Sequence, residues 1–371
     1  MNDPRLTPLA AALPATAPFV GPEAQERAQN QAFIARLGAN ESAFGPSSKA
    51  VLAMGAATPD IWKYGDPENH DLRVALAEHH GVGPEHIAVD AGIDTLMGVI
   101  VRLFVGAGEA VVTSDGTYPT LDYHVTGHGG VIHKVPYQND KTNPAALVAK
   151  AIETGAKLIY LANPDNPMGS WHEATALTRA FADLPEHAIL LLDEAYGEFA
   201  PDRTLPPVDT ADRRILRLRT FSKAYGMAGA RVGYAIGAAE TLVHFDKVRN
   251  HFGMNRVAQV GALAALKDRA WLDHVVNSTA RARERLSWIA GSNGLMPLAS
   301  ATNFVTVDCG AGPDFAAAVK DALIARGIFI RMPFAPPGNR CIRIGAGTPA
   351  DLDHLARALP LALQDARAII G

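Results

Sequence analysis

A single lysine, Lys223, closely follows two hydroxyl residues, Thr220 and Ser222, and an arginine, Arg231, comes eight residues later. A lysine amine that loses its proton can form a Schiff base with an aldehyde. Two hydroxyls and a guanidinium are suitable partners for a phosphate dianion. Pyridoxal phosphate carries both an aldehyde and a phosphate, so this segment predicts a site for that cofactor. A glycine-rich turn with a surface lysine is the alternative.

A second motif ends an apolar run at Asp193, with Tyr196 three residues later. A carboxylate in this position could pair with the pyridine nitrogen and keep it protonated, which makes the ring an electron sink. Tyr196 could donate a hydrogen bond to the phenolic oxygen of the same ring. At this point an aspartate that merely caps the following helix remains an equal alternative.

Three further positions suit the same cofactor. Asn166 lies among the Asn-Pro turns of residues 163–169, which fix the backbone, and its amide could reach the phenolic oxygen. Ile93 and Asp94 precede or open an expected helix, where free backbone N–H groups could hold the phosphate. Tyr118 follows the next apolar run, and its ring could stack on the pyridine or pack in the core.

Arg343 has apolar neighbours on both sides in a short expected strand. An arginine in that setting needs an anion, either a substrate carboxylate or a structural salt-bridge partner. Arg331 ends the preceding strand and could supply a second anion site. Near the other end of the chain, Asn40 lies in a turn-forming segment and Tyr64 in a loop before a helix.

Short apolar runs alternate with amphipathic stretches between residues 86 and 236, which predicts an α/β fold with a mostly parallel sheet covered on both faces. Ligands bind such sheets beyond the carboxyl ends of the strands, where the polar motifs fall. After about residue 240 the alternation gives way to long helical stretches followed by a few short apolar runs. This pattern predicts long helices and a smaller α+β domain. We expect strands at 87–89, 110–113, 131–135, 157–162, 188–193, 215–220, 232–236, 304–307, 328–331 and 341–344, and helices at 48–57, 95–104, 118–126, 144–153, 174–182, 238–250, 256–268, 270–292, 314–326 and 350–369.

The division into domains follows from this change in the pattern of expected helices and strands. Residues 1–40 are expected to form an N-terminal arm, unpacked over 1–30, and part of the small domain. Residues 41–245 form the large cofactor-binding domain, and residues 246–371 form the small domain.

Composition excludes several classes of protein. The net charge of −4 gives no support for a nucleic-acid partner, and no apolar run of 18 or more residues predicts a membrane span. Two cysteines, Cys309 and Cys341, are too few for a disulfide framework and lack metal-ligand spacing, so no metal site is expected. With no signal peptide in view, a cytoplasmic protein is expected.

Taken together, these residues resemble the fold-type I pyridoxal-phosphate aminotransferases of class I/II, and most closely the histidinol-phosphate aminotransferase-like branch. The resemblance spans about residues 36–350. Its specific parts are residues 163–169, which correspond to the family's Asn-Pro-x-Asn-Pro-Thr-Gly, the pair Asp193 and Tyr196, and the Ser-Lys motif with Arg231. It implies an aspartate aminotransferase-like fold, with a large domain built on a mostly parallel seven-stranded sheet and a smaller α+β domain.

The resemblance also implies roles for the residues at the cofactor ring. Lys223 would be the Schiff-base lysine and the proton carrier, and Asp193 would pair with the ring nitrogen. Asn166 and Tyr196 would hold the phenolic oxygen while Tyr118 stacks on the ring. The phosphate would be held by Thr220, Ser222, Arg231 and the backbone amides near Ile93 and Asp94.

Other implied roles concern the substrate and a second subunit. Arg343 would bind the α-carboxyl group or other polar groups of the substrate, with Asn40 close by, and Arg331 would offer the second anion site. Tyr64 would reach the cofactor phosphate of the other subunit, which implies a homodimer with shared active sites.

The sequence departs from the family pattern in five places. Met168 stands where threonine is usual, and residues 115–116 (Asp-Gly) replace a proline-containing approach to the stacking tyrosine. Residues 92–95 lack the usual small residue and acid, and the proline-rich loop 332–339 also differs. Phe19 stands near where the histidinol-phosphate enzymes carry a tyrosine, which weakens histidinol phosphate as the substrate.

The expected activity is transfer of an amino group from an L-amino acid or histidinol phosphate to a 2-oxo acid such as 2-oxoglutarate. Both substrates are small molecules. A decarboxylase of the threonine-phosphate decarboxylase type is the nearest alternative, and a non-catalytic sensor that binds the cofactor is a more distant one. The sequence leaves the donor's side chain open between histidinol phosphate and an aromatic or other amino acid.

Overall fold

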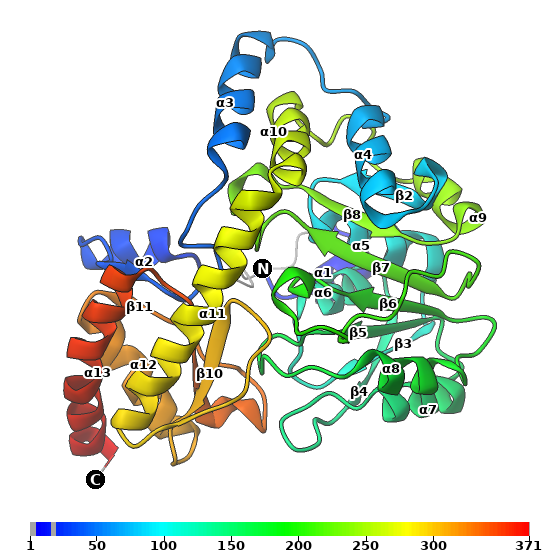
Figure 1. Ribbon diagram of the computed structural model, residues 1–371. Helices are drawn as coiled ribbons and strands as arrows, with labels where there is room; N and C mark the ends of the chain where they lie inside the picture. The colour runs from blue at the N-terminus through cyan, green and yellow to red at the C-terminus, as the bar shows by residue number, and fades with distance from the viewer. Residues whose placement is uncertain (1–4, 16–19, 371) are drawn as a thin grey trace.

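A seven-stranded sheet forms the centre of the larger part of the molecule (Figure 1). The computed structural model describes residues 5–15 and 20–370. The strand order is β2-β8-β7-β6-β5-β3-β4; β8 runs antiparallel to both of its neighbours, whereas the pairs from β7 to β4 are parallel. This confirms the mostly parallel sheet. The strands are β2 (Ile87–Asp90), β3 (Ala110–Ser114), β4 (Val131–Val135), β5 (Leu158–Ala162), β6 (Ile189–Asp193), β7 (Ile215–Thr220) and β8 (Gly233–Ile236).

Helices cover both faces of this sheet because successive strand residues point to opposite sides. Leu158 and Tyr160 of β5 pack with the helices on one face, whereas Ile159 and Leu161 pack with those on the other. Because both faces are apolar and covered, the polar side chains gather at the strand ends. The first face carries α5 (Ile93–Phe104) and α6 (Thr120–Gly127), and the second carries α7 (Pro144–Thr154) and α8 (Ala174–Phe181).

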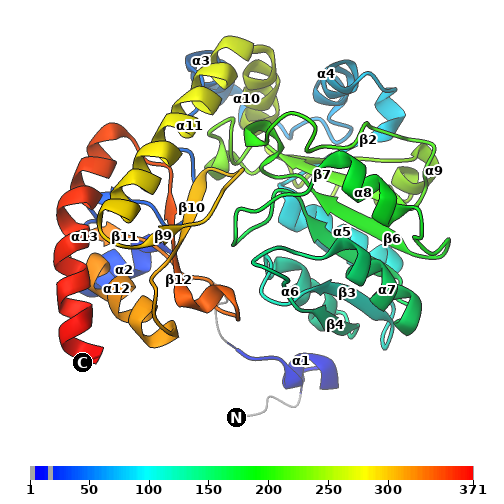
Figure 2. The same ribbon diagram turned by 60° about the horizontal axis from the view of Figure 1, so that its bottom comes forward.

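The smaller part lies beside the carboxyl ends of the central strands (Figure 2). Its antiparallel sheet has the order β12-β10-β9, and a parallel pair joins β1 to β11. Three helices share one apolar core with these strands. The elements are β1 (Ala35–Arg36), β9 (Met296–Pro297), β10 (Phe304–Asp308), β11 (Ile328–Phe329), β12 (Cys341–Gly345), α11 (Arg269–Ser292), α12 (Pro313–Ala325) and α13 (Pro349–Ile370).

A projection stands above the sheet in Figure 1, where α3 (Ser48–Ala57) packs along α10 (Arg256–Lys267), with α4 (His70–His80) nearby. The expected helix over 48–57 is confirmed, and Ser47 caps it by accepting a hydrogen bond from the Ala50 N–H. Among the described residues, no helix is both long and apolar enough to cross a membrane.

The N-terminal segment contains helices α1 (Pro8–Ala12) and α2 (Pro22–Gln29), and Arg36 joins α2 to β1 through ion pairs with Glu23 and Glu26. Pro22 is the one buried residue of these two helices, and their role as an arm stays a prediction. One expectation was wrong. The helix expected over 238–250 is instead a short α9 (Ala239–Leu242) followed by a 3₁₀ helix (Val243–Lys247). Leu242 and Phe245 both enter the core, and their three-residue spacing suits the tighter 3₁₀ turn.

Candidate active site

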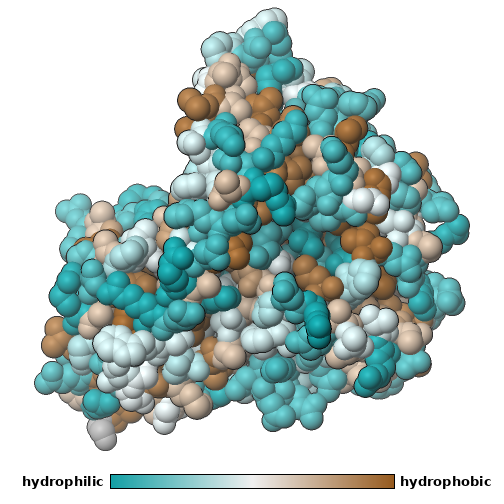
Figure 3. All heavy atoms as spheres, viewed as in Figure 1, coloured by the Kyte–Doolittle hydropathy of each residue, from teal (hydrophilic) through white to brown (hydrophobic). Residues whose placement is uncertain are grey.

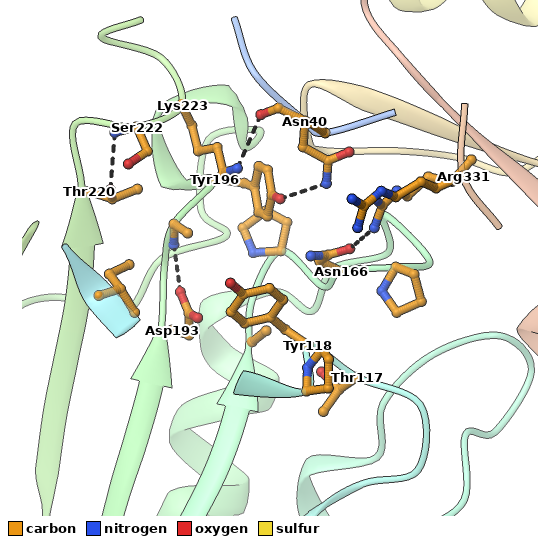
Figure 4. A pocket seen from close by; sticks show the side chains of 18 of the residues that line it. Asn40, Thr117, Tyr118, Asn166, Asp193, Tyr196, Thr220, Ser222, Lys223 and Arg331 are labelled. Carbon is orange, nitrogen blue, oxygen red and sulfur yellow. Dashed lines mark hydrogen bonds between the residues drawn. The ribbon is translucent and has the colours of Figure 1, made fainter. Parts of the chain in front are cut away.

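A pocket of about 360 Å³ lies at the carboxyl ends of β5, β6 and β7, facing the smaller part of the molecule (Figure 4). Its size falls in the usual range for small-molecule sites. It brings together every predicted site residue except Tyr64. The lining includes Asn40, Ile93, Asp94, Tyr118, Asn166, Asp193, Tyr196, Thr220, Ser222, Lys223, Arg231, Arg331 and Arg343.

Lys223 projects into this pocket from the turn after β7 (Figure 4). Its Nζ donates a hydrogen bond to the Asn40 carbonyl oxygen at 3.1 Å and lies 5.6 Å from the centre of the Tyr196 ring. Burial, together with the nearby cation of Arg343, lowers the pKa of Lys223 to about 8. The lysine therefore has a substantial neutral, nucleophilic fraction near neutral pH.

Asp193 is a buried carboxylate at the end of β6. The Tyr160 hydroxyl donates to its Oδ2 at 2.8 Å, and the Ala195 N–H donates to its Oδ1 at 2.9 Å. Burial raises the pKa of Asp193 to about 6, and these hydrogen bonds only partly oppose that change. Within residues 5–15 and 20–370, Asp193 forms no ion pair. The carboxylate therefore fits a cationic ring nitrogen, which would compensate the charge that burial disfavours.

An anion site lies beside the lysine, at the N-terminus of α5. Gly92 precedes the helix with a φ of 92°, and no described side chain caps the first turn, so backbone N–H groups face the pocket. A Cβ at Gly92 would lie 2.5 Å from Arg231 Nη2, so glycine leaves room for the guanidinium. Arg231 Nη1 donates to Ser222 Oγ at 3.3 Å, and Arg231 Nη2 lies 3.6 Å from Asp94 Oδ2. This cradle fits a phosphate group.

Thr220 stabilises the turn that carries Lys223. Its hydroxyl donates to the Val232 carbonyl oxygen at 3.2 Å and accepts a hydrogen bond from the Ser222 N–H at 3.0 Å. These two bonds fix the backbone between β7 and the lysine. Tyr118 lies across the pocket, where its hydroxyl donates to Asp94 Oδ1 at 3.0 Å.

Arg343 approaches the pocket from β12. Its Nη1 donates to Asn166 Oδ1 at 2.5 Å and its Nη2 to the Gly38 carbonyl oxygen at 3.1 Å, while its guanidinium lies 5.3 Å from the Phe304 ring centre. Burial lowers the pKa of Arg343 to about 10. In the described part of the chain it has no ion pair, and its Nε is buried without a hydrogen-bond partner. The arginine therefore has capacity for an anion from outside the protein.

Two more polar residues complete this side of the pocket. Asn40 donates from Nδ2 to the Tyr196 hydroxyl at 2.9 Å, and burial raises the pKa of Tyr196 to about 12. Arg331 lies beside Arg343 because their backbones form an antiparallel bridge, and its Nη2 donates to the Val20 carbonyl oxygen at 2.9 Å. The pocket thus holds two arginines, and Figure 4 shows Arg331 on the side opposite Asp193.

Tyr64 is the one predicted residue that lies away from the pocket. Its side chain is on the projection, 76% exposed, with its ring 4.8 Å from that of Phe252. Its predicted role in the other subunit's site remains a prediction. Phe19 lies outside the described residues.

Some residues that support the site were missed by the sequence analysis. Tyr160, in the middle of an apolar strand, holds Asp193. Glu194 is fully buried on the opposite side of the same strand end and binds two arginines of β7, Arg217 and Arg219, at 2.6 and 2.9 Å. Two arginines at alternate positions of an apolar strand were the available signal, because such a pair requires a buried acid.

Comparison with known proteins shows the family to which the chain belongs. The family described as aminotransferase class I and II matches residues 34–359. A solved histidinol-phosphate aminotransferase from Sinorhizobium meliloti, in complex with pyridoxal-5'-phosphate, is similar at 51% identity and a TM-score of 0.94, over 98% of each chain. A histidinol-phosphate aminotransferase from Roseiflexus castenholzii is 36% identical over 88% of this chain and 89% of the relative.

A solved L-threonine-O-3-phosphate decarboxylase from Porphyromonas gingivalis is similar at 20% identity and a TM-score of 0.76, over 89% of this chain and 100% of that chain. At that identity the likeness shows the fold alone. The fold and the pocket define a fold-type I pyridoxal-phosphate enzyme. The chain belongs to the aminotransferase class I and II family, and it is a pyridoxal-phosphate-dependent aminotransferase.

Proposed function

We propose that this aminotransferase moves the amino group of histidinol phosphate to a 2-oxo acid such as 2-oxoglutarate. The observation that carries the proposal is the placement of Arg331 and Arg343 in the same pocket as Lys223 and Asp193. Two cations on the substrate side suit a donor with a phosphate and an acceptor with two carboxylates. The 51% identity to the Sinorhizobium enzyme supports this donor over an aromatic amino acid.

The bound cofactor would supply an aldehyde that takes up the amino group and a ring that delocalises a carbanion. Lys223 Nζ would hold the cofactor and then take the proton from the substrate carbon that bears the amino group. Asp193 would keep the ring nitrogen protonated, with Tyr160 orienting its carboxylate. Because Asn166 Oδ1 accepts from Arg343, the amide nitrogen of Asn166 is the atom available to donate to the phenolic oxygen, together with the Tyr196 hydroxyl.

The remaining polar residues would bind the cofactor phosphate and the substrate. Arg231, Ser222 and the N–H groups at Ile93 and Asp94 would bind the cofactor phosphate, with Thr220 fixing their turn and Tyr118 stacking on the ring. Asn40, Arg331 and Arg343 would contact the substrate.

A panel of amino donors tests the substrate. Cofactor-loaded protein is assayed with 2-oxoglutarate and, in turn, histidinol phosphate, phenylalanine, tyrosine, histidine, alanine and glutamate. We expect histidinol phosphate to give the highest kcat/KM. A higher value for phenylalanine or tyrosine would assign the pocket to aromatic amino acids instead.

The lowered pKa of Lys223 gives a pH prediction. Only the neutral amine reacts with an aldehyde, and its fraction rises as the pH passes upward through the pKa of about 8. We expect the rate of pyridoxal-phosphate uptake by the apoprotein to rise about tenfold per pH unit from pH 6 and to level off above about pH 8. In Arg343→Ala the plateau should move to higher pH, because a nearby cation is lost. A parent rate that still rises at pH 10 would contradict the shift.

We also propose that the enzyme is a homodimer in which Tyr64 enters the partner's site. Exposed apolar side chains on the projection support this, and Figure 3 shows hydrophobic residues there among hydrophilic ones. Such a surface marks an interaction site. This projection patch consists of Val51, Leu52, Ile61, Trp62, Tyr64 and Phe252, of which Trp62 is 78% exposed.

Sedimentation velocity tests the dimer. The parent should sediment at about twice the 39.3 kDa chain mass, and Leu52→Glu with Trp62→Glu should give monomers with little activity. Mixing inactive Lys223→Ala subunits with Tyr64→Ala subunits should restore activity, because one intact shared site forms in each mixed dimer. A fully active monomeric parent would refute the shared site. We further propose that the enzyme is cytoplasmic and biosynthetic. The free, buried cysteines Cys309 and Cys341 support the cytoplasmic part of this proposal, because thiols stay reduced in that compartment.

A further inference from the structure

Asp165 is a buried carboxylate among the Asn-Pro turns of residues 163–169, at the position that the family motif leaves open. Its exposed fraction is 1%, and no described residue forms an ion pair with it. Burial raises the pKa of Asp165 to about 6, and hydrogen bonds to the carboxylate only partly oppose that change. A buried anion without a counter-charge depends on such hydrogen bonds, so the groups that donate them indicate what Asp165 does.

The Asp165 carboxylate connects three loops of the larger part. The Thr117 hydroxyl donates to Oδ1 at 3.3 Å, and the Tyr137 hydroxyl donates to both oxygens, at 2.9 and 3.0 Å. The Met168 N–H donates to Oδ2 at 3.1 Å within the loop of Asp165 itself. Thr117 follows β3, Tyr137 follows β4 and Asp165 follows β5, so the carboxylate joins the loops at the carboxyl ends of these strands.

Two of these loops carry residues that would contact the cofactor ring. Tyr118 directly follows Thr117, and Asn166 directly follows Asp165; both line the active-site pocket (Figure 4). Asp165 itself is not among the residues that line the pocket. Its carboxylate can therefore affect the ring only by fixing where Tyr118 and Asn166 lie.

The smaller part contacts the Asp165 loop from another side. Thr306 Oγ1 donates to the Pro167 carbonyl oxygen at 2.5 Å, and Arg343 donates to Asn166 Oδ1. A substrate carboxylate that binds Arg343 would compete with Asn166 for the guanidinium. The hydrogen bonds of Asp165 lie outside the pocket, so substrate binding leaves this second anchor of the loop in place.

We propose that Asp165 is a positioning residue that holds Asn166 and Tyr118 in place around the cofactor ring. It does so through the Thr117 and Tyr137 hydroxyls. The inference rests on the ring contacts that the proposed function assigns to Asn166 and Tyr118, and it is independent of which amino donor the enzyme uses.

A pH titration of the cofactor-loaded enzyme, without any amino donor, tests the inference. The link between Lys223 and the cofactor loses a proton as the pH rises, and the visible absorption changes with it. A hydrogen bond to the phenolic oxygen weakens the attraction of that oxygen for the proton, so loss of the Asn166 amide should raise the midpoint of the titration. For Asn166→Ala, which removes the contact completely, we expect a rise of about 1 pH unit or more.

Asp165→Asn and Tyr137→Phe should each raise the midpoint by about 0.5 pH unit or more. Asparagine has one acceptor oxygen in place of two, so it cannot accept from the Met168 N–H and both hydroxyls. Loss of the Asp165 charge alone would lower the midpoint, because the protonated link is cationic, so a rise reports lost positioning. Tyr137→Phe keeps that charge. The double variant should shift the midpoint by less than the sum of the two single shifts, because both act on one network.

Tyr234→Phe is the matched control. It removes another buried tyrosine hydroxyl, which lies 2.9 Å from His80 Nε2 and outside the pocket lining. We expect it to lower the melting temperature about as much as Tyr137→Phe does, but to keep the midpoint of the parent. A purely structural role of the Asp165 network would predict the parent midpoint in all of these variants except Asn166→Ala.

The outcomes separate this inference from the proposed function. If Asn166→Ala raises the midpoint but Asp165→Asn and Tyr137→Phe leave it unchanged or lower it, the positioning role of Asp165 is refuted and the proposed function stands. An equal rise in Tyr234→Phe and Tyr137→Phe would also refute that role. If Asn166→Ala leaves the midpoint unchanged, the proposed ring contact of Asn166 fails and this inference fails with it.

Discussion

Replacing Lys223 by alanine should abolish the visible absorption of the lysine-linked cofactor and lower turnover by about 10⁴-fold or more. The lysine is the amine held in the pocket with a pKa lowered to about 8, and it carries both the covalent link and the proton transfer in our proposal. Absorption spectra and steady-state turnover of the purified variant measure the two effects.

Lys223→Arg is the matched control for this prediction. It keeps a positive charge in the pocket, but a guanidinium does not lose its proton at working pH, so activity should stay as low as in the alanine variant. Added pyridoxal phosphate should still raise the melting temperature of both variants, because Asp193 and the Arg231 cradle remain. Turnover of either variant within tenfold of the parent would show that another group carries the chemistry.

Replacing Arg343 by alanine should raise the KM for 2-oxoglutarate by about 10- to 100-fold, since a charge-assisted hydrogen-bonded pair contributes about 1.5–3 kcal/mol. The guanidinium has no ion-pair partner among the described residues and a buried Nε without a partner, so an incoming carboxylate would meet an available cation. Steady-state kinetics at varied acceptor concentration give KM and kcat separately.

Arg343→Lys separates charge from geometry. Lysine keeps the charge but cannot form paired hydrogen bonds with a carboxylate while also donating to Asn166. We therefore expect Arg343→Lys to recover only part of the affinity for 2-oxoglutarate that Arg343→Ala loses. If the KM of Arg343→Ala equals that of the parent, Arg343 is not a substrate ligand and its role is structural.

The sequence predicted the central sheet and most of the cofactor-side residues because both depend on local pattern. Apolar runs that end in polar residues locate strand ends, and the carboxyl ends of parallel strands converge. Lys223, Asp193 and Asn166 each follow such a run, and the structure places all three at one pocket. The helix expected over 238–250 failed because the burial of Phe245 favoured a tighter turn.

What the sequence could not predict depends on contacts between distant segments. The Asn40 carbonyl oxygen meets Lys223 across 183 positions, and Arg343 meets Asn166 across 177. No periodicity reports such pairs. The same holds for the proline-rich loop 332–339: its residues were noted as a departure, but its position beside Met168 follows only from the packing of the two parts.

Transfer of a labelled amino group tests the central claim most directly. Histidinol phosphate labelled with ¹⁵N is incubated with cofactor-loaded enzyme and 2-oxoglutarate, and the glutamate formed is analysed by mass spectrometry. The account predicts that the glutamate carries the label in proportion to histidinol phosphate consumed, and that Lys223→Ala forms none. Consumption of histidinol phosphate without labelled glutamate, or no consumption at all, would contradict it.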